Sequence, residues 1–345
     1  MKPLRLIPLA MLAAASALAS GWQPDRLFPG YEARTVDQGT DYDGPVRSTI
    51  VRRLADCPGS RKGVLYIHGY NDYFLQPEMG RRFADSCYSF YAVDLRRYGR
   101  SLRPGDPRFD IRDMHEYFPD IDSAVADMKR QGIDSIVLMG HSTGGLTTSL
   151  YMASRPDTAI RALVLNSPFL DWNQSALQEK LLIPAVQCVG GWWPRLTVMP
   201  GAKSAYVPTG STRLDHGTWA IDNDWKPDEW PRINAGWIRS IDRAHDELRS
   251  KAGAIKVPVL LMHSDHTFRK GDRPSLRDSS DTVLDVADIS RYGRRLGPDV
   301  TEATVKGGTH DLVRSAPGIR QATYRTIFSW LDSKNSRQAA KPTAK

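Results

Sequence analysis

The chain has 345 residues, of which 41% are hydrophobic, 25% charged and 9% aromatic. These proportions are globular, and they exclude a long disordered chain, a collagen-like repeat and a multi-span membrane protein. Lysine and arginine number 47 against 39 acidic residues, which gives a formal charge of +8. Because the basic residues are scattered rather than clustered in one stripe, we expect no nucleic-acid partner.

The N-terminus has the features of a secretory signal peptide over residues 1–19. Lys2 and Arg5 precede an apolar, alanine-rich run, and Ala17-Leu18-Ala19 supplies the small residues that a signal peptidase accepts. The apolar run is too short to span a bilayer comfortably. We therefore expect an exported protein, periplasmic or secreted, without stable membrane insertion.

Export makes a disulfide chemically reasonable, because disulfides persist outside the cytoplasm. Cys57 precedes the apolar run Gly63–His68, and Cys87 precedes the run Ser89–Asp94. If these runs are neighbouring parallel strands, both cysteines lie near the same edge of the sheet and can form a bond. Cys188 then remains an unpaired thiol.

Short apolar runs alternate with helical patterns along most of the chain. The predicted strands are Val46–Asp56 (with its following turn), Val64–Ile67, Phe90–Val93, Ser135–Met139, Ala162–Leu165, Val257–Met262 and Val300–Val305. The predicted helices are Pro77–Asp85, Asp120–Gln131, Gly144–Ala153, Asp285–Leu296 and Ile319–Leu331. Nearly continuous apolar strands between helices indicate a parallel sheet covered on both faces. The predicted fold class is α/β.

The alternation stops over residues 168–250. This stretch holds seven of the nine tryptophans: Trp172, Trp192, Trp193, Trp219, Trp225, Trp230 and Trp237. We interpret it as an inserted cap over the carboxyl edge of the sheet, in which most tryptophans fill the cap's own core. A few that line an apolar cleft would suit an acyl chain. The core then comprises residues 20–167 and 251–333, and a flexible polar tail covers 334–345.

The sharpest chemical signal is Gly140-His141-Ser142-Thr143-Gly144-Gly145, between an apolar run and a helical pattern. On a tight strand-to-helix turn a serine is forced into strained backbone geometry and its Oγ projects at the sheet edge. The residues two before and two after it must be small, as Gly140 and Gly144 are. Ser142 is therefore the predicted nucleophile.

A serine hydroxyl needs a base, and the candidate is His310, directly after the last predicted strand. A carboxylate that holds the imidazole should follow Val257–Met262. Asp281 is preferred because its segment enters the next helix directly, and Asp265 is the alternative because it is closest to the strand end. His263-Ser264-Asp265-His266 has no further ligand at a supporting spacing, so we expect no metal.

Backbone donors must stabilise the oxyanion of an acyl-transfer reaction. Thr143, immediately after the nucleophile, supplies one N–H, and Tyr70 in the loop after Val64–Ile67 is expected to supply the other. His68 is expected to brace this loop rather than to transfer protons.

These motifs resemble the α/β-hydrolase superfamily, and within it the branch of monoacylglycerol lipases, lysophospholipases and the serine aminopeptidase family. The resemblance rests on Leu65–Gly69, Asp94–Ser101, Gly140–Gly145 and Val257–His263, and it covers about residues 46–331. It implies a mostly parallel eight-stranded sheet with helices on both faces, a Ser-His-Asp triad and no cofactor.

Two positions depart from the family's pattern. Arg97 stands where the segment Asp-x-Arg-Gly-x-Gly usually has glycine. The His-Gly-x-x-Asp that usually carries the acid is here His263-Ser264-Asp265-His266-Thr267, followed by a polar stretch to Ser280. The assignment of the acid therefore stays open between Asp281 and Asp265.

The predicted function is an exported serine hydrolase of carboxylic esters, lipid-like ones with an apolar acyl group such as monoacylglycerols or lysophospholipids. A serine aminopeptidase is the first alternative. It needs a fixed carboxylate for the substrate's ammonium, and none of the cap's acids, such as Asp222, Asp224 or Glu229, stands out. The second alternative, a non-catalytic binding protein on this fold, is disfavoured by the intact Ser142 and His310.

Overall fold

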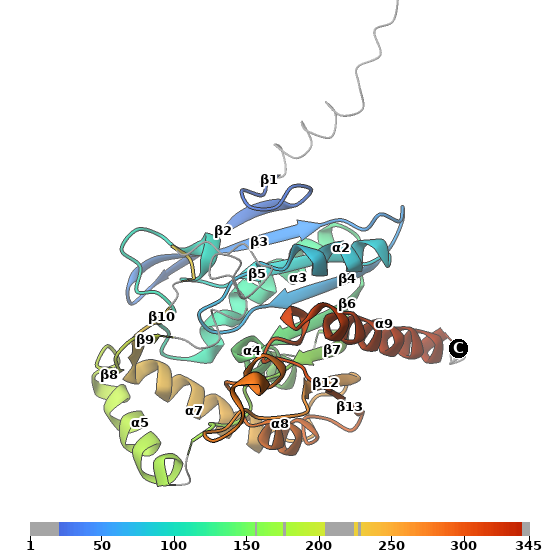
Figure 1. Ribbon diagram of the computed structural model, residues 1–345. Helices are drawn as coiled ribbons and strands as arrows, with labels where there is room; N and C mark the ends of the chain where they lie inside the picture. Colours follow the sequence, from blue (N-terminus) through green and yellow to red (C-terminus); the bar gives the residue numbers. More distant parts are fainter. Residues whose placement is uncertain (1–20, 156, 175–176, 204–223, 227–228, 340–345) are drawn as a thin grey trace, which may run out of the picture.

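The computed structural model describes residues 21–155, 157–174, 177–203, 224–226 and 229–339 (Figure 1). The predicted signal peptide, residues 1–19, lies outside the described residues. Within the described ranges, no helix combines the length and the apolar character that a membrane crossing requires.

A nine-stranded sheet forms the centre of the part of the chain that the structure describes, in the order β1-β2-β3-β5-β4-β6-β7-β12-β13. Its strands are β1 Gln23–Pro24, β2 Glu32–Asp41, β3 Gly44–Arg53, β4 Lys62–Ile67, β5 Ser89–Asp94, β6 Ser135–His141, β7 Ile160–Asn166, β12 Val259–Ser264 and β13 Val300–Val305. The six strands from β5 to β13 in this order are parallel, and β1, β2 and β3 are antiparallel to their neighbours. The expected eight strands correspond to this sheet without the two-residue β1.

Helices cover both faces of the sheet (Figure 1). They are α2 Pro77–Asp85, α3 Phe118–Arg130, α4 Thr143–Ser154, α5 Ile183–Trp192, α7 Ala235–Ser250, α8 Val286–Gly293 and α9 Pro317–Ala339. Single-turn or irregular helices are η1 Gly99–Ser101, η2 Met114–Tyr117, η3 Gln178–Leu182, η5 Pro274–Ser279 and η6 Leu312–Arg314.

Strand β4 shows why the central strands are apolar throughout. Leu65 and Ile67 belong to one core, shared with α3, α4, α7 and α8. Val64 and Tyr66 belong to the other, shared with α2 and α9. Because side chains alternate between the two faces of a strand, a strand buried on both faces needs apolar residues at every position. The predicted α/β class is confirmed.

Strand β2 is the main element that the sequence pattern does not predict. Its ten residues, EARTVDQGTD, include no buried position. The strand is ordered by pairing with β3 rather than by an apolar run. It therefore lacks the hydrophobic signal on which strand prediction depends.

The C-terminal segment differs from the predicted flexible tail over 334–345. Helix α9 continues to Ala339. Lys334 Nζ lies 2.7 Å from Asp299 Oδ1, and Asn335 Nδ2 donates to the Tyr88 hydroxyl at 2.9 Å. These contacts extend the helix through 334–339, and residues 340–345 lie outside the described range.

The predicted disulfide between Cys57 and Cys87 is present, with 5.2 Å between the two Cα atoms. Cys57 precedes β4 and Cys87 precedes β5, and these strands are parallel neighbours. The bond therefore lies at the amino edge of the parallel strands, away from the edge where their carboxyl ends meet. Cys188, on α5, is a free and exposed thiol, as expected.

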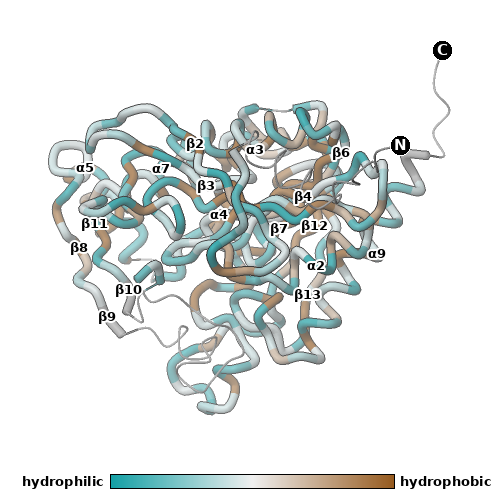
Figure 2. Tube along the Cα trace, turned by 90° about the horizontal axis from the view of Figure 1, so that it is seen from above, coloured by the Kyte–Doolittle hydropathy of each residue, from teal (hydrophilic) through white to brown (hydrophobic). Residues whose placement is uncertain are grey.

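We call residues 168–250 the cap segment. Its described residues add no strand to the large sheet, and they form η3, α5, α7 and two short strand pairs. These strands are β8 Thr197–Met199, β9 Ala202–Lys203, β10 Glu229–Trp230 and β11 Ile233–Asn234. Figures 1 and 2 both show α5, β8, β9 and β10 together at the end of the molecule opposite α9.

Candidate active site

Ser142 occupies a sharp turn between β6 and α4. Its φ of +54° and ψ of −120° lie outside the regions that a residue with a Cβ prefers. Hydrogen bonds on both sides hold this conformation: the Ser142 N–H donates to the Asn166 carbonyl at 3.1 Å, and the Ser142 carbonyl accepts from the Phe169 N–H at 2.9 Å. The strain is thus fixed by the end of β7 and the start of the cap segment.

The glycines around Ser142 are required by close backbone contacts. A Cβ on Gly140 would lie 2.5 Å from the Gly144 carbonyl oxygen. A Cβ on Gly144 would clash with the carbonyl oxygens of Ile67 and His68 at the end of β4. Helix α4 can therefore begin this close to the sheet only with glycine at both positions.

His310 and Asp281 are hydrogen-bonded to each other. His310 Nδ1 lies 2.9 Å from Asp281 Oδ2. The other carboxylate oxygen of Asp281 accepts the backbone N–H groups of Val283 and Leu284, each at 2.8 Å. Since an ionised carboxylate only accepts hydrogen bonds, His310 Nδ1 carries the hydrogen, and Nε2 of the neutral ring retains its lone pair. Asp281 is fully buried and His310 is almost so.

An additional segment between β12 and Asp281 explains the unusual sequence spacing between this strand and the acid. After β12 the chain passes Thr267, leaves through residues 269–280, and returns so that Thr267 and Asp281 form an isolated parallel bridge. The Asp281 N–H donates to the His266 carbonyl at 2.8 Å, and the Phe268 N–H donates to the Asp281 carbonyl at 2.7 Å. Asp281 therefore lies beside Thr267, the position at which the family's pattern places the acid.

Asp265, the alternative acid, has a different partner. Its side chain is exposed, and Oδ1 accepts the Gly307 N–H at 2.8 Å. This hydrogen bond ties the end of β12 to the turn after β13, three residues before His310. Of the two candidate acids, the structure brings Asp281 to His310.

The loop after β4 packs directly against Ser142. A Cβ on Gly69 would lie 3.0 Å from the Ser142 Cβ, so a larger residue would push the loop away. His68 Nε2 accepts the Leu95 N–H at 3.1 Å, and therefore its Nδ1–H donates to the Gly69 carbonyl at 2.8 Å. Burial lowers the pKa of His68, which keeps the ring neutral in this bracing role.

A pocket of about 300 Å³ opens at this edge of the sheet, and Tyr70, Thr143, Ser142 and His310 all line it. Its polar end also includes Asn71, Asp72, His141 and Lys226. Its apolar walls come mainly from the cap segment and the loop after Asp281: Phe169, Trp172, Met199, Pro200, Pro231, Ile233, Trp237, Ile238, Val283 and Leu284. The four residues predicted for the nucleophile, base and oxyanion donors therefore share one cavity.

Arg97, where the family commonly has glycine, adopts a left-handed backbone with φ of +64°. Its guanidinium is buried, and Nη2 lies 2.8 Å from Asp41 Oδ2 at the end of β2. Nη1 donates to the Asp110 carbonyl at 3.0 Å. These contacts stabilise an arginine in a conformation that glycine adopts at less cost.

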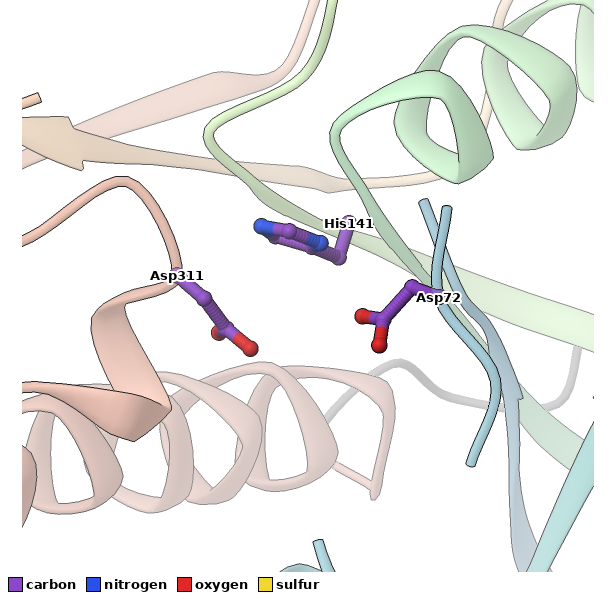
Figure 3. Close-up of side chains that lie close together, drawn as sticks. All are labelled: Asp72, His141 and Asp311. Carbon is purple, nitrogen blue, oxygen red and sulfur yellow. The ribbon is translucent and has the colours of Figure 1, made fainter. Parts of the chain in front are cut away.

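At the polar residues of the pocket, His141 lies between Asp72 and Asp311 (Figure 3). One potential ligand atom from each of the three lies within 4.8 Å of the others, so the group has the composition of a metal site. The carboxylates are already engaged, however: Asp72 Oδ1 accepts from Lys226 Nζ at 2.7 Å, and Asp311 accepts from Gln76 and Asn166. A protein ammonium thus takes the place that a cation would fill beside Asp72.

The charges of this buried cluster balance without an added ion. Asp72 and Asp311 are offset by Lys226 and Arg314, all four of which are buried. Burial lowers the pKa of His141 to about 4, so this ring is neutral near pH 7. We therefore interpret the cluster as an ion-pair network of the protein itself. The two histidines of the sequence motif at 263–266 have separate partners: His263 hydrogen-bonds to Glu302, and His266 hydrogen-bonds to Asp272.

Sequence reasoning did not single out Asp72, Lys226 or Asp311. Asp72 lies two residues after the predicted oxyanion donor, and Asp311 directly follows the predicted base, so their positions offered a weak signal. The only sequence signal for Lys226 was its neighbour Trp225. The pattern of the cap segment does not show which of its residues face the core.

The chain belongs to the family described as "Serine aminopeptidase, S33", whose model matches residues 58–315. It is 24% identical over 257 residues to the human "(Lyso)-N-acylphosphatidylethanolamine lipase", covering 71% of this chain and 72% of that protein. It is 30% identical over 123 residues to the "Probable lysophospholipase BODYGUARD 2" of Arabidopsis thaliana. That match covers 34% of this chain but only 25% of the plant protein.

Solved structures share the fold at low sequence identity. A soluble variant of the monoglyceride lipase of Saccharomyces cerevisiae superimposes with a TM-score of 0.63 at 14% identity, over 88% of this chain and 96% of that one. This similarity, together with the family match, confirms the predicted α/β-hydrolase fold.

Proposed function

We propose that this member of the S33 family is a serine hydrolase that cleaves carboxylic esters with an apolar acyl group, using Ser142, His310 and Asp281. Ser142 Oγ attacks the ester carbonyl, and His310 Nε2 accepts its proton and passes it to the leaving alcohol. Water then attacks the acyl-enzyme with the same histidine as base. Asp281 holds the imidazole through Nδ1–H and stabilises the imidazolium that forms in each step.

The observation that carries the proposal is the His310–Asp281 hydrogen bond of 2.9 Å, because it orients a histidine that lines the same pocket as Ser142. The strained elbow presents Ser142 there, and the N–H groups of Tyr70 and Thr143 are proposed to stabilise the oxyanion. No cofactor takes part in this proposed mechanism.

An apolar acyl group fits the pocket's lining. Trp172, Trp237 and Ile238 of the cap segment face the same cavity as the nucleophile, and apolar walls with a polar end suit an amphiphilic ester. The human relative is named as a (lyso)-N-acylphosphatidylethanolamine lipase and the plant relative as a probable lysophospholipase, which supports lipid-like esters such as lysophospholipids as substrates.

The aminopeptidase alternative is weaker because of Asp72. Among the described residues that line the pocket, Asp72 is the one acid that could hold a substrate ammonium. Its carboxylate is already bonded to Lys226 Nζ at 2.7 Å. A peptide N-terminus would have to displace this internal ammonium. Asp222 lies outside the described residues, Asp224 is exposed, and the side chain of Glu229 is likewise outside the described part.

Export remains part of the proposal, with a periplasmic or secreted location. The disulfide between Cys57 and Cys87 supports it, because such bonds persist in oxidising compartments. Expression of the full chain in a bacterium followed by mass spectrometry of the accumulated protein tests it. Loss of residues 1–19 is expected, and a protein that keeps them after export would contradict the signal peptide.

Fluorophosphonate labelling with peptide mapping tests the mechanism. A stoichiometric adduct on Ser142 is expected, because only an activated serine reacts at useful rates. Ser142→Ala and His310→Ala should each lower ester turnover by about 10⁴-fold or more without changing the melting temperature much. Near-normal turnover in either folded variant would remove the residue from the mechanism.

A further inference from the structure

The loop that carries Tyr70 is strained at the next residue. Asn71 has a φ of +51°, in the left-handed region that favours glycine. A non-glycine residue keeps such a conformation only where its surroundings hold the chain on both sides. The Gly69 carbonyl, which shares a peptide unit with the Tyr70 N–H, is held by His68 Nδ1–H at 2.8 Å. The contacts that flank Asn71 therefore act together with this hydrogen bond in setting where the Tyr70 N–H points.

On one side of Asn71 the loop is held by aromatic packing. The Tyr70 ring centroid lies 4.6 Å from that of Trp237 and 5.4 Å from that of Phe109. Aromatic pairs of this kind have preferred geometries, and the Tyr70 hydroxyl also donates to the Arg232 carbonyl at 3.5 Å. These contacts anchor the Tyr70 side chain against Phe109 and the cap segment.

On the other side the loop is held by charge, and the charge comes from the cap segment. Lys226 Nζ lies 2.7 Å from Asp72 Oδ1, with both side chains 3% exposed. The preceding residue, Trp225, packs edge-on against Tyr73 at 5.4 Å. Two consecutive residues of the cap segment thus contact two consecutive residues of the loop.

The two charges of this pair stabilise each other against the cost of burial. Burial disfavours the Asp72 carboxylate, yet Lys226, Arg314 and His141 together hold its pKa below the ordinary value. Burial likewise lowers the pKa of Lys226, with Asp72 acting against that effect. A charged hydrogen bond in a dry site is directional, and removing one partner leaves the other charge uncompensated.

Asp311 does not share this dependence on the cap segment. Its carboxylate accepts from Gln76 Nε2 at 3.0 Å and from Asn166 Nδ2 at 2.7 Å, both of which belong to the core. Asp72 and Asp311 flank the same histidine, so one side of the network is held by the core and the other by the cap segment.

We propose that Lys226 is a positioning residue of the active site: its ammonium, supplied by the cap segment, fixes Asp72, which acts with the His68–Gly69 hydrogen bond to direct the Tyr70 N–H towards the substrate oxyanion. The inference rests on the proposed serine hydrolase function. Docking of the cap segment and stabilisation of the transition state are then coupled through one ion pair.

The test compares Lys226→Met, Asp72→Asn and the double variant in the full-length protein, with 4-nitrophenyl acetate as substrate. An acetyl group is too short to sample the acyl-binding walls, so the assay reports on the reacting centre. Lys226→Met should lower kcat about 10-fold to 100-fold and change KM less than threefold, because a displaced donor weakens transition-state stabilisation. The double variant should be no worse than the poorer single variant, since the two residues act as one pair.

Lys180→Met, the same substitution at an exposed position of the cap segment, is the matched control and should keep the parental kcat. If Lys226→Met fails to fold, kcat of the double variant is measured in its place. The double variant removes both charges of the pair, so neither is left uncompensated. Parental kcat in folded Lys226→Met or in the folded double variant would overturn the inference. A change confined to KM or to the melting temperature would overturn it as well. In both cases Ser142 would still be labelled. A parent without turnover and without Ser142 labelling would overturn the proposed function and this inference together.

Discussion

The core and the cap segment position their side chains by different means. In the core, the carboxyl ends of parallel strands place the site: Ser142 and His310 follow β6 and β13, and the bridge to Thr267 returns Asp281 to the end of β12. In the cap segment, short strands and helices supply pocket walls, and individual contacts with the core hold them. In the proposed mechanism, the core therefore supplies the nucleophile, base and acid, and the cap segment supplies the acyl-binding walls and the ammonium of Lys226.

The cap segment is itself divided. Helix α7 has a buried face that includes Ile241, Ala244 and Leu248, as a core helix does. Around α5, by contrast, Trp192 is 79% exposed and Trp193 is 67% exposed. Among the described residues of the cap segment, α7 is therefore packed like a core helix, whereas the end of α5 is exposed.

The assignment of chemistry to the core is tested most severely by Asp281→Asn. Loss of the carboxylate removes the group that orients His310, so kcat for a short ester should fall by about 10⁴-fold. Asp265→Asn is the matched control, because that residue bonds to Gly307 N–H rather than to His310; its effect should stay within a few fold. A large loss in Asp265→Asn alone would reverse the two roles.

Removal of the disulfide tests whether turnover at the carboxyl edge of the sheet depends on the covalent bond at its amino edge. The double variant Cys57→Ser/Cys87→Ser removes a bond between residues 30 positions apart, and the free energy of unfolding should fall by about 2–4 kcal/mol. Turnover at a temperature where the variant is folded should stay near the parental value, because the bond lies at the amino edge. Thermal melting with and without reductant measures the first effect, and a proportionate drop in kcat would show that the edges are coupled.

The assignment of substrate choice to the cap segment is tested by Met199→Ser. Met199 lines the pocket from β8 and is half-exposed, so its loss should raise KM for a decanoyl ester about fivefold, equivalent to ~1 kcal/mol of apolar contact. Acetyl ester turnover should be unchanged. Leu196→Ser, equally exposed but outside the pocket lining, is the control. Equal changes for long and short esters would remove Met199 from acyl recognition.

The core-like character of α7 predicts a smaller effect, on the pH dependence of stability. Burial lowers the pKa of His245 to about 3, and its Nε2–H donates to the Phe169 carbonyl at 2.9 Å. As pH falls below about 6.5, the unfolded chain binds a proton that the folded chain refuses, so stability decreases with falling pH. His245→Gln should therefore show a shallower fall in melting temperature between pH 7 and 4.5. An unchanged slope would mean that His245 titrates normally.

The core and its site were largely predictable because each depends on local sequence patterns. The apolar runs of β4 to β7 mark strands buried on both faces, and the glycines around Ser142 follow from the closeness of α4 to β4. His310 was predictable from its place after the last strand. These features need only the order of elements along the chain.

What the sequence could not show depends on contacts between distant segments. Strand β2 has no apolar run and is ordered by pairing with β3. The choice between Asp281 and Asp265 depends on the bridge between Thr267 and Asp281, which no residue pattern encodes. Lys226 reaches Asp72 across 154 positions, and nothing in its local sequence marks it as buried.

The bridge between Thr267 and Asp281 also makes the segment 269–280 a suitable place for inserting additional residues. The backbone bonds at His266 and Phe268 close this segment at its base. The entropic cost of closing a flexible loop grows slowly, by about 0.6 kcal/mol for each doubling of its length. A peptide tag or a small folded module inserted among the exposed residues 275–278 would therefore leave the acid beside its histidine, which offers a site for immobilising or fusing the protein without rebuilding its chemistry.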